Sequence, residues 1–329
     1  MMQGKKISAL LFCAASLAFA AGCGKAKNET SGSSASATPG QTIGISIPAQ
    51  DHGWTGGVAF WAARAKEDIE KANPDIKVLI AAAATSAEQV DKIENLLVQG
   101  IDALVVLPNE PKPLTNVCTR AAGKGVRLVV VDRGLAKDVQ TLYVAGDNAG
   151  FGRRSAEVIA RELNGEGDIV IMEGVPCQVN TDRVEAFREV MKKYPKIRIL
   201  ESQTSNWQTE RGLTLMENFL QKYPKIDAVW AGDDDVLAGA LKAYQESKRS
   251  DVKLFVGGGG SKFIVKKILD GDPLVRQTVT YPPRMIYVAA QEAVKLLRGE
   301  KPADKKLIVP AEEINRENAK DFYFPASSY

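Results

Sequence analysis

Acidic, basic and aromatic side chains recur directly after the runs of this sequence that are predicted to be buried strands. Carboxylates accept hydrogen bonds and an arginine presents a planar fork of donors, so together they suit the hydroxyl groups of a small solute. Aromatic rings suit the apolar C–H faces of the same kind of molecule. The candidates are Asp132, Arg133, Arg183 and Asp233 for the hydroxyl edges, and Trp54, Trp207 and Tyr281 for the faces.

The elements that must position these side chains follow one rhythm, in which a short β-branched run precedes a helical stretch and then another run. Near-continuous apolar runs of this length are typical of parallel strands that are buried on both faces. The expected strands are 42–48, 76–81, 103–107, 127–132, 143–145, 167–173, 197–202, 228–231, 253–257 and 276–280. Helical periodicity fills the gaps, for example at 58–71, 87–100, 150–163, 184–194, 209–223 and 283–298. The pattern predicts an α/β fold of doubly wound parallel sheets.

Chain length indicates more than one core. About 288 residues follow the N-terminal segment, which exceeds what a single core usually holds. A strand-helix-strand set runs over 42–145 and again over 167–280, as expected for two similar lobes. Because open parallel sheets bind ligands outside the carboxyl ends of their strands, the candidate side chains should meet there.

The N-terminal segment has the layout of a secretory signal. Lys5 and Lys6 precede the apolar run 7–21, which is too short to span a membrane and ends in small residues before Cys23. This ending resembles the bacterial lipobox, which implies removal of residues 1–22 and lipidation of Cys23. Ala20 stands where that motif favours Leu, so cleavage without lipidation is the alternative. Residues 23–41 are rich in small polar residues and are expected to form a flexible tether.

Charge and cysteine content narrow the function classes. Lys5 and Lys6 leave with the signal, so the 43 basic residues become 41 against 40 acidic ones, and nucleic acid is not an expected partner. Of the four cysteines only Cys118 and Cys177 remain in the folded part. Their spacing has no metal or redox signature, so they are expected to be two buried thiols, with a disulfide as the alternative. No metal and no cofactor are expected.

Several motifs together resemble the periplasmic sugar-binding proteins of the ribose-binding type, the class I solute receptors of ABC importers. The resemblance covers nearly all of residues 42–310, with the motifs in the family's order and at its intervals. They include Asp132-Arg133 after the fourth expected strand, Asp182-Arg183 before a helix and Asn206-Trp207 before the next. The other motifs lie at 50–54, 103–110, 146–148, 231–240 and 256–257.

The resemblance implies a fold, a location and a function. Lobe one would comprise 42–146 and 282–309, lobe two 147–281, and the tail 310–329 would lie over the three-strand hinge or on lobe two. The protein would be an extracytoplasmic, monomeric receptor for a sugar or sugar alcohol, held at a membrane by its lipid. It would close by hinge bending and deliver its ligand to an ABC permease with a separate ATPase. The alternative partner is a chemotaxis or histidine-kinase signalling protein.

The resemblance also extends the expected site. It adds His52, Asp51 and Glu110 to the ligand-binding residues, and it assigns ligand contact to Asp233 and helix capping to Asp234. Other interpretations stay open: Asp132-Arg133 as a structural salt bridge, Arg183 on a solvated helix start, and Trp207 as core after Asn206 as N-cap.

Three departures from the family bear on the ligand. Gly259 stands where ribose-type receptors have an Asp, Tyr281 where they have Gln, and Thr55 where they have a second aromatic ring. Since a polar site rejects ligands that leave its groups unpaired, these changes argue against ribose held in the same way.

Two rival classes fit poorly. The chain lacks a Walker motif, a dinucleotide fingerprint and a nucleophile elbow, and it has a single His, so an enzyme is not expected. DNA-binding repressors that share the two-lobed fold begin with a helix-turn-helix, whereas this chain begins with the signal and tether.

Overall fold

The computed structural model describes residues 40–50 and 52–329. The predicted signal, Cys23, nearly all of the tether and Asp51 lie outside the described residues. One sheet has six parallel strands in the order β11-β5-β4-β3-β1-β2. Its strands are β1 (Gln41–Pro48), β2 (Ile76–Ala83), β3 (Ala103–Val106), β4 (Arg127–Val131), β5 (Leu142–Gly146) and β11 (Lys306–Val309).

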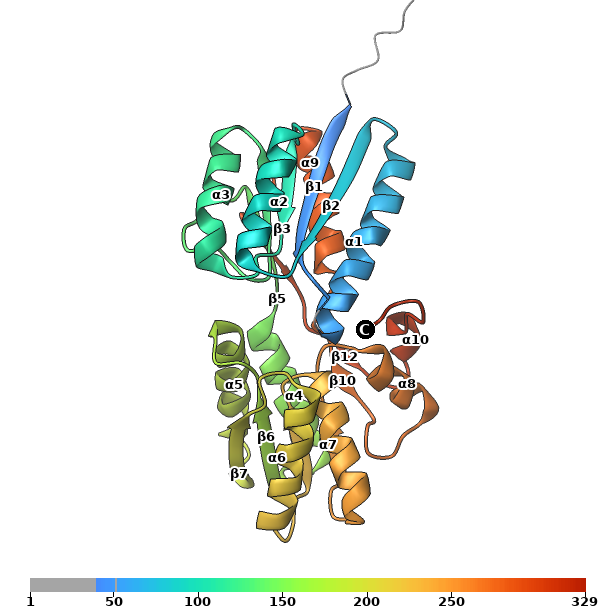
Figure 1. Ribbon diagram of the computed structural model, residues 1–329. Helices are drawn as coiled ribbons and strands as arrows, with labels where there is room; N and C mark the ends of the chain where they lie inside the picture. The colour runs from blue at the N-terminus through green and yellow to red at the C-terminus, as the bar shows by residue number, and fades with distance from the viewer. Residues whose placement is uncertain (1–39, 51) are drawn as a thin grey trace, which may run out of the picture. The chain divides into compact units, whose positions relative to one another are not determined.

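Helices cover both faces of the six-stranded sheet (Figure 1). They are α1 (Gly53–Ala72), α2 (Ser86–Val98), α3 (Pro111–Gly123) and α9 (Met285–Leu297). Alternate residues of each strand point to opposite faces, so Ala103 and Val105 pack in the core with α1 and α9. Leu104 and Val106 pack in the core with α2 and α3. Both faces therefore bury apolar side chains, which explains the near-continuous apolar runs in the sequence.

A second sheet has four parallel strands in the order β7-β6-β8-β9. Its strands are β6 (Glu166–Glu173), β7 (Lys196–Thr204), β8 (Ala228–Ala231) and β9 (Leu254–Val256). The same alternation buries Ile171 and Trp230 with α4 and α5, and Met172 and Val229 with α6, α7 and α8. These helices are α4 (Asn148–Glu162), α5 (Gln178–Met191), α6 (Thr209–Lys222), α7 (Asp234–Ser247) and α8 (Lys262–Asp270).

The expected strand at 276–280 does not join the second parallel sheet, so that part of the prediction was wrong. Only β10 (Thr278–Val279) forms, and it pairs antiparallel with β12 (Glu313–Ile314), while Thr280 makes a parallel bridge to Gly259. The partner of this short run lies more than thirty residues further along the chain, where no strand signal was recognised. The short helix α10 (Ala319–Phe322) follows β12.

The two cysteines of the folded part are free thiols. Cys118 is buried in the core beside α3, and burial raises its pKa to about 12. Cys177 is exposed directly before α5, so the expectation of two buried thiols was wrong for this residue.

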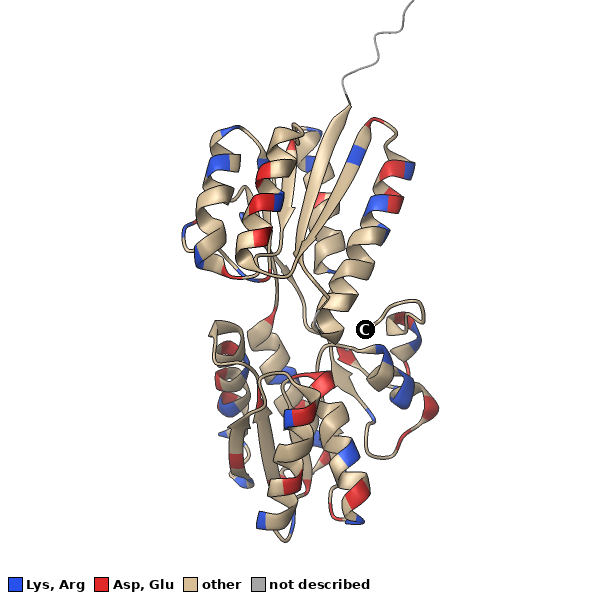
Figure 2. Cartoon of the chain, viewed as in Figure 1, with Lys and Arg blue, Asp and Glu red and all other residues tan. Residues whose placement is uncertain are grey.

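Charged residues of both signs are spread over the described region, and none of its helices is suited to crossing a membrane. Basic and acidic residues alternate along the helices visible in Figure 2, and neither sign forms a continuous stripe on that face. Within residues 40–50 and 52–329 no helix has the length and apolar character needed to cross a bilayer.

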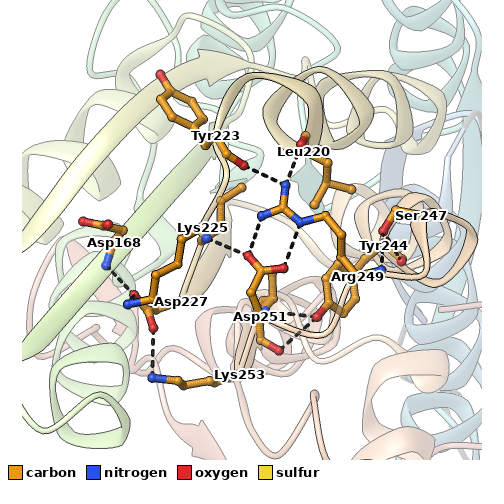
Figure 3. Close-up of polar contacts among 12 residues, drawn as sticks. Asp168, Leu220, Tyr223, Lys225, Asp227, Tyr244, Ser247, Arg249, Asp251 and Lys253 are labelled. Carbon is orange, nitrogen blue, oxygen red and sulfur yellow. Dashed lines mark hydrogen bonds and ion pairs between the residues drawn. The ribbon is translucent and has the colours of Figure 1, made fainter.

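A polar cluster closes the amino ends of the strands of the second sheet (Figure 3). Asp227, which is 1% exposed, forms ion pairs of 2.9 Å with the ammonium groups of Lys225 and Lys253. Its Oδ2 also accepts a 2.9 Å hydrogen bond from the backbone N–H of Asp168. Beside it, Arg249 donates to the carboxylate of Asp251 and to the last carbonyl groups of α6. Burial raises the pKa of Asp227. The backbone N–H of Asp168 and the ammonium groups of Lys225 and Lys253 lower it by more, so that the pKa is about 2, below the ordinary 3.8.

Asp227→Asn should lower the free energy of unfolding by about 1–3 kcal/mol near neutral pH, because it leaves two ammonium groups without their buried partner. A carboxylate whose pKa is lowered by folding stabilises the protein fully at pH values above its pKa in the unfolded chain. This stabilisation is lost as the pH falls through its pKa in the folded protein. The stability difference between the two proteins should therefore narrow from pH 3.8 towards about 2.

Urea unfolding at several pH values measures this difference. Glu166→Gln is the matched control, because its ion pair with Lys196 is about 70% exposed on both sides and should contribute less than about 0.5 kcal/mol. A constant difference between wild type and Asp227→Asn over the whole range would contradict the assignment.

Candidate functional site

The centre of the site is a hydrogen bond between two residues that are distant in sequence. Asp132 follows β4 in the left-handed region with φ of 59°, which an Asp tolerates better than most residues. Its Oδ1 accepts from the hydroxyl of Tyr281, which lies just after β10. Both side chains are buried, and burial followed by the Asp132 charge raises the pKa of Tyr281 well above its ordinary value. Tyr281 therefore stays a neutral donor to Asp132.

Arg183 of α5 packs against the other side of Tyr281. Its guanidinium lies 4.3 Å from the ring centroids of both Tyr281 and Phe151, a separation at which cation–π attraction acts. Its Nε donates to Oδ1 of Asn148 at 2.9 Å, and its Nη1 donates to the carbonyl oxygen of Gly232 at 2.9 Å. Asn148 in turn donates to the hydroxyl of Tyr281 at 3.4 Å. The arginine is thus 5% exposed and fixed in place, and it does not lie on a solvated helix start.

Two tryptophans flank this network. Trp54 of α1 donates from Nε1 to the carbonyl oxygen of Tyr281 at 2.9 Å, and its ring lies 6.1 Å from the Tyr281 ring. Trp207 lies 6.0 Å from the Arg183 guanidinium and has φ of 57°, an outlier for a bulky residue. Its Nε1 is buried and makes no hydrogen bond to a described residue.

The three consecutive aspartates make different contacts, and the helix cap is not the one expected. Asp233 is the N-cap of α7 and accepts from the N–H of Asp235 at 2.7 Å, so the expectation that Asp234 caps the helix was wrong. Asp234 is buried and accepts from the N–H groups of Gly260 and Ser261 and from the Thr278 hydroxyl. These bonds hold the loop at Gly260 and Ser261, and they leave the capping of α7 to Asp233. Burial raises its pKa to about 6.

Asp233 and Asp235 are also affected by desolvation. Burial raises the pKa of both carboxyls, and for Asp233 the two neighbouring aspartates add to the rise while Arg183 opposes it. For Asp235 the opposing groups are His52 and the backbone N–H of Gly53. Asp235 therefore links α7 to the start of α1.

The remaining expected site residues lie further from the network. Arg133 donates from Nη1 to the carbonyl oxygen of Asn109 at 3.0 Å. Glu110 is exposed and precedes α3, with no capping bond from its side chain to a described residue. His52 is exposed and forms a capping box with Thr55 at the start of α1. Asp51 lies outside the described residues.

One expected helix cap was wrong, and two residues that contact Arg183 were not expected. The N-cap of α6 is Gln208, so the interpretation of Asn206 as N-cap was wrong. Asn148 and Phe151, which hold Arg183, were not predicted as site residues. Asn148 belongs to the motif at 146–148, whereas the only signal for Phe151 is its position in the first turn of α4, after β5.

The arrangement suits a neutral polyhydroxylated ligand. Oδ2 of Asp132 and Nη2 of Arg183 make no hydrogen bond to a described residue, so an acceptor and a donor remain next to aromatic rings. Within the described part of the chain no cluster of three or more His, Cys, Asp or Glu side chains could hold a metal ion. Cavities of about 160 and 140 Å³ lie elsewhere, both bordering Tyr329.

Comparison with known proteins gives consistent results. The pattern of the periplasmic binding protein domain matches residues 43–301. A ribose import binding protein of Bacillus subtilis is 30% identical over 79% of this chain and 83% of its own length. A xylitol-binding protein of Mycolicibacterium smegmatis is 32% identical over 57% of this chain and 54% of its own length. The solved fructose-binding periplasmic domain of a hybrid two-component system has a TM-score of 0.72 and 26% identity, covering 86% of this chain and 93% of that one. This chain therefore belongs to the periplasmic binding protein domain family.

Proposed function

We propose that this protein is an extracytoplasmic receptor that binds a sugar or sugar alcohol between its two sheets and delivers it to the permease of an ABC importer. One observation carries the proposal: Asp132 at the end of a strand of the six-stranded sheet and Arg183 beside the four-stranded sheet meet on the two sides of Tyr281. Carboxylate, guanidinium and aromatic rings are the groups that recognise hydroxyls and C–H faces.

The proposed mechanism is hinge bending about three chain crossings. The chain passes between the two sheets after β5, between β9 and α9, and after β11. At the first crossing, a Cβ on Gly146 would come within 2.2 Å of the Tyr281 ring, so only glycine fits against this side chain. Lobe one would comprise 42–146 and 282–309, and lobe two 147–281. A ligand that bonds both Asp132 and Arg183 favours the closed state, because only closure lets both groups bind it.

Attachment to a membrane is part of the proposal. A lipidated Cys23 and the tether 23–41 would retain a monomeric receptor near its permease while leaving both lobes free to move. Asp51, His52, Glu110 and Arg133 are proposed to line the rim of the cleft. The support for lipidation is the run of small residues directly before Cys23, although Ala20 stands where the motif favours Leu.

A signalling partner is the second candidate. The similarity to the fructose-binding periplasmic domain of a hybrid two-component system favours it. Ligand binding would be the same in both cases, and a pull-down with the permease or with the kinase sensor domain would separate them.

A thermal-shift screen of the purified protein should find one strongly stabilising compound. The panel comprises D-ribose, D-xylose, L-arabinose, D-glucose, D-galactose, D-allose, D-fructose, xylitol and myo-inositol, with nucleosides and amino acids as controls. A ligand at 100 times its Kd should stabilise the native state by about 2.7 kcal/mol, because it binds only the folded protein. A response to nucleosides or amino acids with none to the panel would overturn the sugar proposal.

Asp132→Asn and Arg183→Lys should each weaken that ligand roughly 10- to 100-fold, because each removes hydrogen bonds that involve a charged group. Asp91→Asn and Arg127→Lys are the matched controls, since both residues are exposed on other parts of the first sheet and its helices. Isothermal titration measures the affinities, and circular dichroism confirms that the unliganded variants are folded. Wild-type affinity in both site variants would mean that the ligand binds elsewhere.

A further inference from the structure

The last segment of the sequence, 323–329, lies between α1 and α8. The ring of Phe324 packs edge-on against Trp61 of α1 at 5.0 Å. On the other side, Lys262 at the start of α8 donates to the carbonyl oxygens of Pro325, at 3.2 Å, and of Ser327. In Figure 1 the end of the chain, marked C, lies beside the start of α1. The segment is therefore fixed by contacts to both sides of the molecule.

The first turn of α1 is shaped for this segment by its glycines. A Cβ on Gly56 would come within 2.5 Å of the Ser328 hydroxyl, and one on Gly57 within 3.0 Å of Cβ of Tyr329. A Cβ on Gly53 would meet the Tyr329 ring at 3.0 Å. The missing side chains leave room for Tyr329, which is 6% exposed.

The hydroxyl of Tyr329 fills the space of another missing side chain. A Cβ on Gly259 would lie 1.8 Å from this oxygen. Gly259 has φ of 123°, a conformation that L side chains rarely adopt, and its carbonyl oxygen accepts from the N–H of Tyr281 at 3.2 Å. The Tyr329 hydroxyl thus lies beside the residue that bonds Asp132.

The Tyr329 hydroxyl is buried and makes no hydrogen bond to a described residue. A buried hydroxyl without a partner is costly, so its position points to a partner that binds there. Burial, and then the charges of Asp233, Asp234 and Asp235, raise its pKa well above the ordinary value, so it remains a neutral group that can both donate and accept.

We infer that Tyr329 is a specificity-determining residue of the site, whose hydroxyl, lying where a side chain at position 259 would otherwise stand, bonds one hydroxyl group of the bound sugar or polyol. The inference rests on the proposed function.

The test compares wild type, Tyr329→Phe and Tyr329→Ala by isothermal titration with the panel compound that binds wild type most tightly. Tyr329→Phe removes only the oxygen and should weaken binding roughly 3- to 10-fold, the range expected for one neutral hydrogen bond. Tyr194→Phe is the matched control, because Tyr194 is half-buried near the start of β7, away from the site. Its affinity should equal that of wild type.

Monodeoxy forms of the same compound identify the contact. For the one analogue that lacks the contacted hydroxyl, wild type and Tyr329→Phe should bind equally, whereas the other analogues should keep the difference. Equal affinity of wild type and Tyr329→Phe for the parent compound would overturn the inference while leaving the proposed function intact. Tighter binding by Tyr329→Ala would also overturn it, since the ring would then be a plug that competes with the ligand. If no panel compound binds wild type, the proposed function and the inference fail together.

Discussion

The hydrogen bond from Tyr281 to Asp132 is the interaction on which the rest of the site depends. It fixes a residue from the segment after β10 to the end of a strand in the six-stranded sheet. The same tyrosine ring supports the Arg183 guanidinium, and its backbone carbonyl holds the Trp54 indole. One buried tyrosine thereby contacts a carboxylate, a guanidinium and an aromatic ring of the site.

The sheets and their helices could largely be predicted from the sequence, because strands buried on both faces leave near-continuous apolar runs. The four strands of the second sheet and the first five of the six-stranded sheet agree with the expected runs to within about three residues. β11 was not expected, since Lys306–Val309 is short and alternates between exposed and half-buried side chains. β10 was assigned to the wrong sheet because its pairing with β12 depends on a segment distant in sequence.

The site could be predicted only in part. Asp132 and Tyr281 follow strands, Trp207 comes just before α6, and Arg183 lies in α5, the helix after β6. Their convergence could be anticipated from the rule that ligands bind at carboxyl ends of parallel strands. The identity of the helix cap among Asp233, Asp234 and Asp235 could not, because it depends on backbone angles. Tyr329 gave no local signal at all, since its place is set by glycines in α1 and at position 259.

The most direct test of the central claim is a crystal structure of the full chain with the panel compound that stabilises it most. The account predicts ligand density between the two sheets, with hydroxyl groups within hydrogen-bond distance of Oδ2 of Asp132 and Nη2 of Arg183. Ligand density in another cavity, such as the one lined by Trp61 and Pro283, with none beside Asp132, would contradict it.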